Sequence, residues 1–94
     1  MSKRHRPDEA NADRRDRWLP LSELQPNQKA VLRAINAPNP LAHRLMALGI
    51  VPGTEVEVVR TAAFGDPMEI RMRGFRLALR KRDAQLLLVE PQPP

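Results

Sequence analysis

The chain has 94 residues, no Cys and a net charge of +5. These values limit it to one small domain and exclude disulfides and thiolate metal sites. No apolar run approaches the roughly 20 residues that cross a bilayer, and no apolar segment like that of a secretory signal follows the N-terminus, so we expect a cytoplasmic protein. With one Trp, two Phe and no Tyr, the core must be aliphatic.

Composition divides the chain into three parts. Residues 1–17 are charged and lack large apolar residues apart from Met1, which is typical of a disordered extension. Residues 18–90 hold nearly all the apolar residues and predict the folded domain. Residues 91–94 form a Pro-rich tail.

The domain opens with Leu21 and Leu24, whose spacing suits one helical turn packed on the core. Residues 25–28 predict a turn, because Pro26 stands at its second position. Residues 29–35 then predict a strand, with Val31 and Ile35 among its apolar positions and Leu32 breaking the alternation.

A helix is predicted after the loop that ends at residue 40. Asn39 can cap it, and Pro40 suits the first helical position, where no N–H is needed. Gly49 ends the helix in the left-handed conformation, and Ile50 then contacts the helix in a Schellman motif. Apolar residues recur at i, i+4 and i+7 and predict a stripe committed to the core: Leu41, Leu45 and Leu48.

Four strands complete the domain. Residues 54–61 are rich in Val, and residues 68–73 and 75–80 alternate large apolar side chains with charged ones or Ala78 about Gly74. A turn at Arg73-Gly74 places Met72 opposite Phe75, and further apolar residues face each other along the two strands. One face of the hairpin is therefore apolar and the other is basic. Leu86 to Val89 predict a last, buried strand. About five strands with one inserted helix indicate a mainly β fold, a small and strongly bent barrel.

No catalytic constellation is visible. His43 is a lone helical histidine beside Arg44, and the carboxylates of Asp66 and Glu69 stand where turns and strand faces place acids. Neither a nucleophile–base pattern nor a phosphate-binding loop is present. We therefore expect no enzyme, no cofactor and no metal site.

The ordered motifs resemble the ferrous iron transport protein A (FeoA) family over about residues 19–89. They are Leu21 to Leu24, Arg44 to Val56 with its Leu-Gly-Ile-Val-Pro-Gly core, Gly65 to Ile70, and Arg76 to Ala84. The resemblance implies an SH3-like barrel with a helical insertion. It also implies a non-enzymatic accessory protein that works with the membrane ferrous iron transporter FeoB.

Two surfaces are candidate partner-binding sites. The outer face of the helix carries His43, Arg44, Met46 and Ala47, and we expect it to bind FeoB or a second copy of the chain. The alternative is that Met46 fills core space. The basic hairpin face supplies long-range attraction through Arg71, Arg73 and Arg76, with Glu55 or Glu57 of the neighbouring strand as ion-pair partners.

Other functions stay open at this point. The basic hairpin also suits a nucleic-acid-binding or regulatory small-barrel module, although nucleic-acid binding usually adds stacking aromatics that are scarce here. A weak transition-metal-binding iron chaperone is a further alternative, with few donor side chains to support it.

Overall fold

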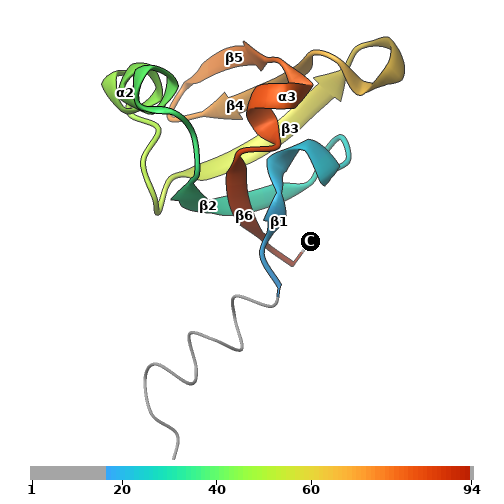
Figure 1. Cartoon of the computed structure of the whole chain (residues 1–94). Helices are drawn as coiled ribbons and strands as arrows, with labels where there is room; N and C mark the ends of the chain where they lie inside the picture. The colour runs from blue at the N-terminus through green and yellow to red at the C-terminus, as the bar shows by residue number, and fades with distance from the viewer. Residues whose placement is uncertain (1–16, 94) are drawn as a thin grey trace, which may run out of the picture.

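The computed structural model describes residues 17–93, which form one antiparallel sheet in the order β1-β6-β2-β3-β4-β5 (Figure 1). The sequence predicts about five strands, and the sixth is a two-residue strand at one edge. The predicted extension up to residue 17 lies almost entirely outside the described residues. The strands are β1 (Leu19–Pro20), β2 (Lys29–Ile35), β3 (Glu55–Thr61), β4 (Met68–Met72), β5 (Phe75–Leu79) and β6 (Leu87–Pro91).

The sheet bends around an aliphatic core, as the scarcity of aromatic residues requires. Short helical segments connect the strands: η1 (Leu21–Glu23), α2 (Asn39–Ala47), η2 (Ala63–Gly65) and α3 (Lys81–Ala84). The mainly β class with one inserted helix of more than one turn is confirmed. The buried apolar residues come from strands β2 to β6, from the short helices and from the turns beside them: Leu21, Leu24, Ala30, Leu32, Leu45, Ile50, Val56, Val58, Met68, Ile70, Met72, Leu79, Ala84, Leu87 and Val89.

β1 and β5 are the edge strands of the sheet. They are connected by packing between the short helical segments beside them and not by hydrogen bonds between the strands. Segment η1 follows β1 directly, α3 follows β5 after one residue, and the two segments pack against each other. Leu21 and Leu24 are both buried there, which confirms the predicted helical turn. Residues Lys81–Ala84 form the four-residue helix α3.

Strand β2 differs from its prediction in which residues face the core. Ala30 and Leu32 are buried, whereas Val31 is only half-buried, so Leu32 does not break the alternation but belongs to it. The physical reason is a β-bulge, because the register with β6 shifts between Leu32 and Ala34. The extra residue, Arg33, turns outward and donates from Nε to Glu90 Oε1 at 2.9 Å.

Helix α2 begins at Asn39, one residue earlier than predicted. Pro38 is the N-cap residue, and its carbonyl accepts the first helical hydrogen bond, from the Ala42 N–H at 2.9 Å. Asn39 is therefore the first helical residue, and the prediction that it caps the helix is wrong. Pro40 is tolerated at the second position because the first-turn N–H groups have no partner inside the helix.

The end of α2 is confirmed as a Schellman motif. Gly49 has φ +89°, its N–H donates to the Met46 carbonyl at 2.9 Å, and the Ile50 N–H donates to the Leu45 carbonyl at 3.0 Å. Thr54 Oγ1 then donates to the Gly49 carbonyl at 3.3 Å and accepts from the Val51 N–H at 3.2 Å. These bonds fasten the helix end to the start of β3.

The predicted apolar stripe of α2 is only partly buried. Leu45 is in the core and Leu41 packs against it, but 43% of Leu48 is exposed. Leu48 is the C-cap residue, and it lines a surface groove with Leu77 of β5 instead of closing onto that strand. The prediction that Leu48 is committed to the core is therefore wrong.

The β4–β5 hairpin has the predicted register. Met72 is paired with Phe75, Ile70 with Leu77, and Met68 with Leu79. Arg73 and Gly74 form the turn with φ +49° and +86°, the pair of positive angles that a two-residue hairpin favours. Strand β6 starts one residue later than predicted and continues to Pro91, which is paired with Ala30.

Candidate partner-binding surface

The outer face of α2 is exposed as predicted. His43, Arg44, Met46 and Ala47 all lie in solvent, while Leu45 on the opposite side is buried. Met46 is 44% exposed, so the alternative that it fills core space is wrong. A nine-residue helix with one buried position per two turns leaves most of its surface free for contacts.

Apolar exposure is concentrated at the C-terminal end of α2. Among the described residues four large apolar side chains are exposed, and three of them lie within six positions: Met46, Leu48 and Val51. Beside them runs a groove of about 290 Å³ between α2, β5 and α3. The sequence analysis missed this groove because it assigned Leu48 to the core. The lining of the groove combines three basic side chains and one acid with apolar residues that include two leucines: Arg44, Arg80, Arg82 and Asp83, with Leu48 and Leu77.

Arg73 connects the hairpin to the helix. A Cβ placed on Gly49 would lie 3.6 Å from Arg73 Nε and 3.7 Å from its Cδ, so the arginine lies over the helix terminus. The C-terminal end of a helix carries a partial negative charge, which attracts a guanidinium. The structure therefore brings the hairpin turn and the end of α2 into one surface (Figure 1).

The other two hairpin arginines are paired with acids. Arg71 and Arg76 are directly opposite each other across β4 and β5. Arg71 Nη1 lies 3.5 Å from Glu57 Oε1, which is one of the two predicted partners, and Arg76 Nη1 lies 3.2 Å from Glu69 Oε2. This pairing relieves the repulsion between the two guanidiniums.

Glu69 is the acid that the sequence analysis did not connect to the arginines. It accepts hydrogen bonds from Arg60 Nε at 2.8 Å and from Arg76 Nη1 at 3.2 Å. The hydrogen bond from Arg60, followed by that from Arg76, holds the pKa of Glu69 below its ordinary value. The alternation of charge along β4 could have indicated this, since Glu69 follows the same outward face as Arg71.

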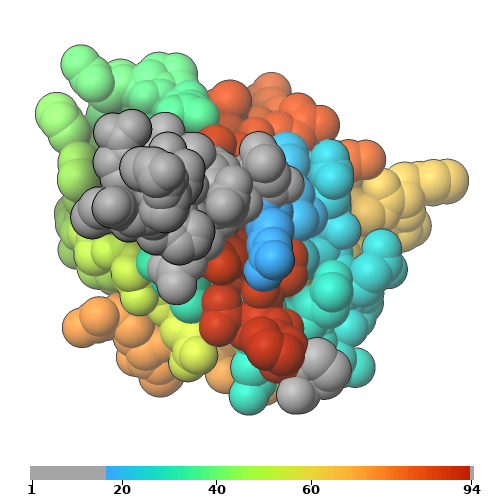
Figure 2. Space-filling view, turned by 90° about the horizontal axis from the view of Figure 1, so that it is seen from below, coloured from blue at the N-terminus to red at the C-terminus, as the bar shows by residue number. Residues whose placement is uncertain are grey.

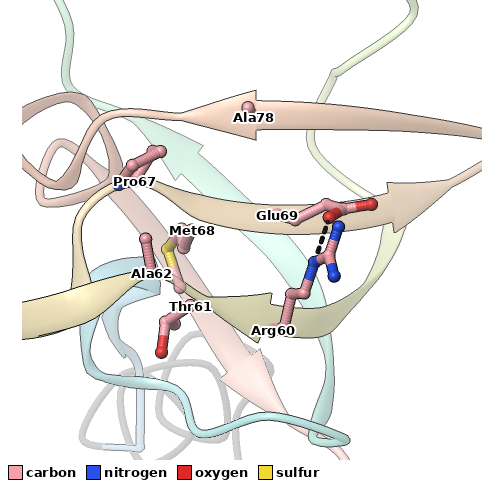
Figure 3. Close-up of a pocket in the computed structure, with 7 residues that line it drawn as sticks. All are labelled: Arg60, Thr61, Ala62, Pro67, Met68, Glu69 and Ala78. Atoms are coloured by element: carbon pink, nitrogen blue, oxygen red, sulfur yellow. Dashed lines mark hydrogen bonds and ion pairs between the residues drawn. The ribbon is translucent and has the colours of Figure 1, made fainter.

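A shallow cavity of about 430 Å³ lies beside this cluster (Figure 3). Its polar side chains are the hydrogen-bonded Arg60 and Glu69, together with Thr61, and its remaining lining is apolar. In the described part of the chain no three His, Cys, Asp or Glu side chains come together as metal ligands.

Phe64 is the second feature that the sequence analysis missed. It stands in η2 with φ +61° and is 98% exposed, far more than any other large apolar side chain described. The available signal was a lone aromatic residue among turn-forming neighbours in Ala-Ala-Phe-Gly-Asp-Pro. Figure 1 shows this loop at the end of the molecule away from α2.

Comparison with known proteins gives a consistent family. The FeoA domain model matches residues 19–91. A Porphyromonas gingivalis protein described as an Fe(2+) transport protein A/Fe(2+) transporter FeoB fusion is 31% identical over 70 residues, which are 74% of this chain and 8% of that protein. The chain thus spans under a tenth of this curated relative. Within residues 17–93, no helix is long and apolar enough to cross a membrane.

Solved structures agree with this match. An FeoA-like protein from Clostridium acetobutylicum is 33% identical with a TM-score of 0.75, over 83% of this chain and 91% of that one. FeoA from Stenotrophomonas maltophilia, in complex with zinc and described as an SH3 domain protein, is 34% identical with a TM-score of 0.66, over 74% of this chain and 87% of that one. The predicted SH3-like fold is confirmed.

Proposed function

This chain belongs to the FeoA domain family, and from that premise we propose that it is a non-enzymatic cytoplasmic accessory protein that docks on the membrane ferrous iron transporter FeoB and modulates its assembly or activity. The observation that carries the proposal is the fusion in P. gingivalis, where a region similar to this chain shares one polypeptide with an FeoB transporter. A covalent link raises the effective concentration of one module at the other, which is useful when the two act together.

The end of α2 is the docking surface that we propose. Binding energy in protein interfaces is concentrated in a few apolar or arginine side chains that become fully desolvated. Met46, Leu48 and Val51 supply exposed apolar area, and Met adapts its shape to a partner. Arg44 and Arg73 flank them and favour an acidic or carbonyl-rich partner surface.

The hairpin face has a smaller part in this proposal. Arg71 and Arg76 are already engaged by Glu57 and Glu69, so moving them onto a partner carries the cost of breaking those pairs. They contribute to long-range attraction, which changes the association rate more than the strength of the complex.

A pull-down tests the function. The full-length chain is mixed with detergent-solubilised membranes from cells that contain or lack the cognate transporter. We expect the chain to be retained only with the transporter, and retention in both samples or in neither contradicts the proposal. Anaerobic ferrous iron titration of the chain alone separates this role from that of an iron chaperone, which requires saturable binding.

A further inference from the structure

The Phe64 loop is built to hold an aromatic side chain away from the barrel. Phe64 adopts a left-handed conformation that is a rare and strained one for a bulky residue. Three backbone hydrogen bonds enforce it: Ala62 N–H to the Pro67 carbonyl at 2.9 Å, Gly65 N–H to Ala62 at 2.8 Å, and Asp66 N–H to Ala63 at 3.3 Å. The loop projects beyond the sheet in both views (Figures 1 and 2).

A basic segment is fastened to the base of this loop. The Lys81 N–H donates to Asp66 Oδ1 at 3.1 Å, so the first residue of α3 lies beside the loop. Arg80, Lys81 and Arg82 are all exposed. Figure 2 shows the start of α3 next to the projecting loop.

The charge at this end of the molecule is positive. Glu69 is occupied by Arg60 and Arg76, and the side chain of Arg60 is itself 76% exposed. The remaining acids near the loop are Asp66, which accepts from Lys81, and Asp83. Together the five cations exceed the three carboxylates by two: Arg60, Arg76, Arg80, Lys81 and Arg82 against Asp66, Glu69 and Asp83.

We propose that the Phe64 loop and the basic segment Arg80–Arg82 form a contact site for the anionic surface of a lipid bilayer. Phe64 enters the boundary between headgroups and acyl chains, and the basic side chains lie at the lipid phosphates. Long Arg and Lys stems can reach phosphates while their apolar parts stay near the interface.

The shape of the loop favours a bilayer over a protein pocket. The neighbours of Phe64 are small, namely Ala62, Ala63 and Gly65, so no apolar ring surrounds it on its own surface. Protein hot spots are usually enclosed by a rim that excludes water. A lone aromatic at the apex of a convex loop can be covered on all sides by a lipid interface, which deforms around it.

This contact does not depend on the proposed docking to a transporter. The Phe64 loop lies at the end of the molecule away from α2 (Figure 1), and the basic segment lies between them, because Arg80 and Arg82 also line the groove beside α2. One aromatic residue and three basic residues give weak and reversible binding, which orients a protein at a membrane without anchoring it.

Flotation of the full-length chain with protein-free vesicles tests the proposal. Vesicles of phosphatidylcholine are compared with vesicles that also contain phosphatidylglycerol. We expect binding to the anionic vesicles only, with affinity reduced about tenfold or more by Phe64→Ser and by the double change Arg80→Glu with Arg82→Glu. Met46→Ser, which removes exposed apolar area at the end of α2 and not at the loop, leaves binding unchanged.

Two further measurements decide the outcome. In Phe64→Trp, an emission shift to shorter wavelength on anionic vesicles, beyond the contribution of Trp18 in the parent chain, supports insertion of the loop. Equal binding by Phe64→Ser and the parent chain overturns the proposal. A lipid-free dimer in sedimentation velocity that Phe64→Ser abolishes also overturns it, because a second copy would then be the partner of Phe64.

Discussion

Arg73 lies over Gly49, with its Nε 3.6 Å from the point that a Cβ of residue 49 would occupy. This contact joins two segments that are 24 positions apart in sequence, the end of α2 and the β4–β5 turn. Both residues have positive φ, +89° for Gly49 and +49° for Arg73. The candidate partner-binding surface therefore rests on two tight turns that position each other.

The first prediction concerns Gly49. Gly49→Val should lower the free energy of unfolding by more than about 1 kcal/mol, because a β-branched residue is disfavoured at positive φ and the added methyls meet Arg73. Urea unfolding midpoints measure this. Ala47→Val, at an exposed helical position two residues earlier, is the control and should cost only a few tenths of a kcal/mol. An unchanged midpoint for Gly49→Val would contradict the left-handed helix stop.

A second prediction tests the inward face of β2. Leu32→Ala should destabilise the protein by about 2–5 kcal/mol because it removes a fully buried side chain. Val31→Ala, one residue away on the other face, should cost about 1 kcal/mol or less. Equal losses for the two variants, measured by urea unfolding, would contradict the assignment of Leu32 to the inward face of β2 and Val31 to the outward face.

A third prediction follows from the lowered pKa of Glu69. Since the folded-state pKa lies below that of the unfolded chain, the stabilising contribution of Glu69 is complete above the ordinary glutamate value, about 4.3, and is lost as the pH falls through the lowered folded value. The stability advantage of the parent chain over Glu69→Gln should therefore shrink at acidic pH. Carboxyl NMR titration provides the direct check, and a Glu69 pKa at or above the ordinary value would contradict it.

The sequence predicts local structure best where one physical constraint acts alone. Gly49 and Gly53 mark positive-φ positions, and alternation along residues 68–79 determines the hairpin register because any slip by one residue would place arginines in the core. Asn27, with φ +73°, follows Pro26 in the predicted turn and adopts a conformation that Asn tolerates.

Other features depend on packing that no local pattern encodes. The bulge at Arg33 reverses the apparent faces of β2, and its position depends on the pairing with β6 and on Glu90. Leu48 has the spacing of a core residue but stands where the helix leaves the barrel. Phe64 is apolar and fully exposed, the reverse of what hydrophobic patterning assumes, which is why its loop was read only as a turn.

The central claim is that the end of α2 docks on the ferrous iron transporter. It is tested most directly by titrating the full-length chain onto the cognate transporter held in nanodiscs of neutral lipid, which removes any anionic lipid contact. Met46→Glu should weaken binding about thirtyfold or more, as for the loss of one hot-spot residue, while its thermal midpoint stays near that of the parent chain because Met46 is exposed. Gln28→Glu adds the same charge in an exposed turn away from α2 and should bind normally (Figure 1). Normal binding by a folded Met46→Glu would contradict the claim and move the interface to Arg71, Arg73 and Arg76.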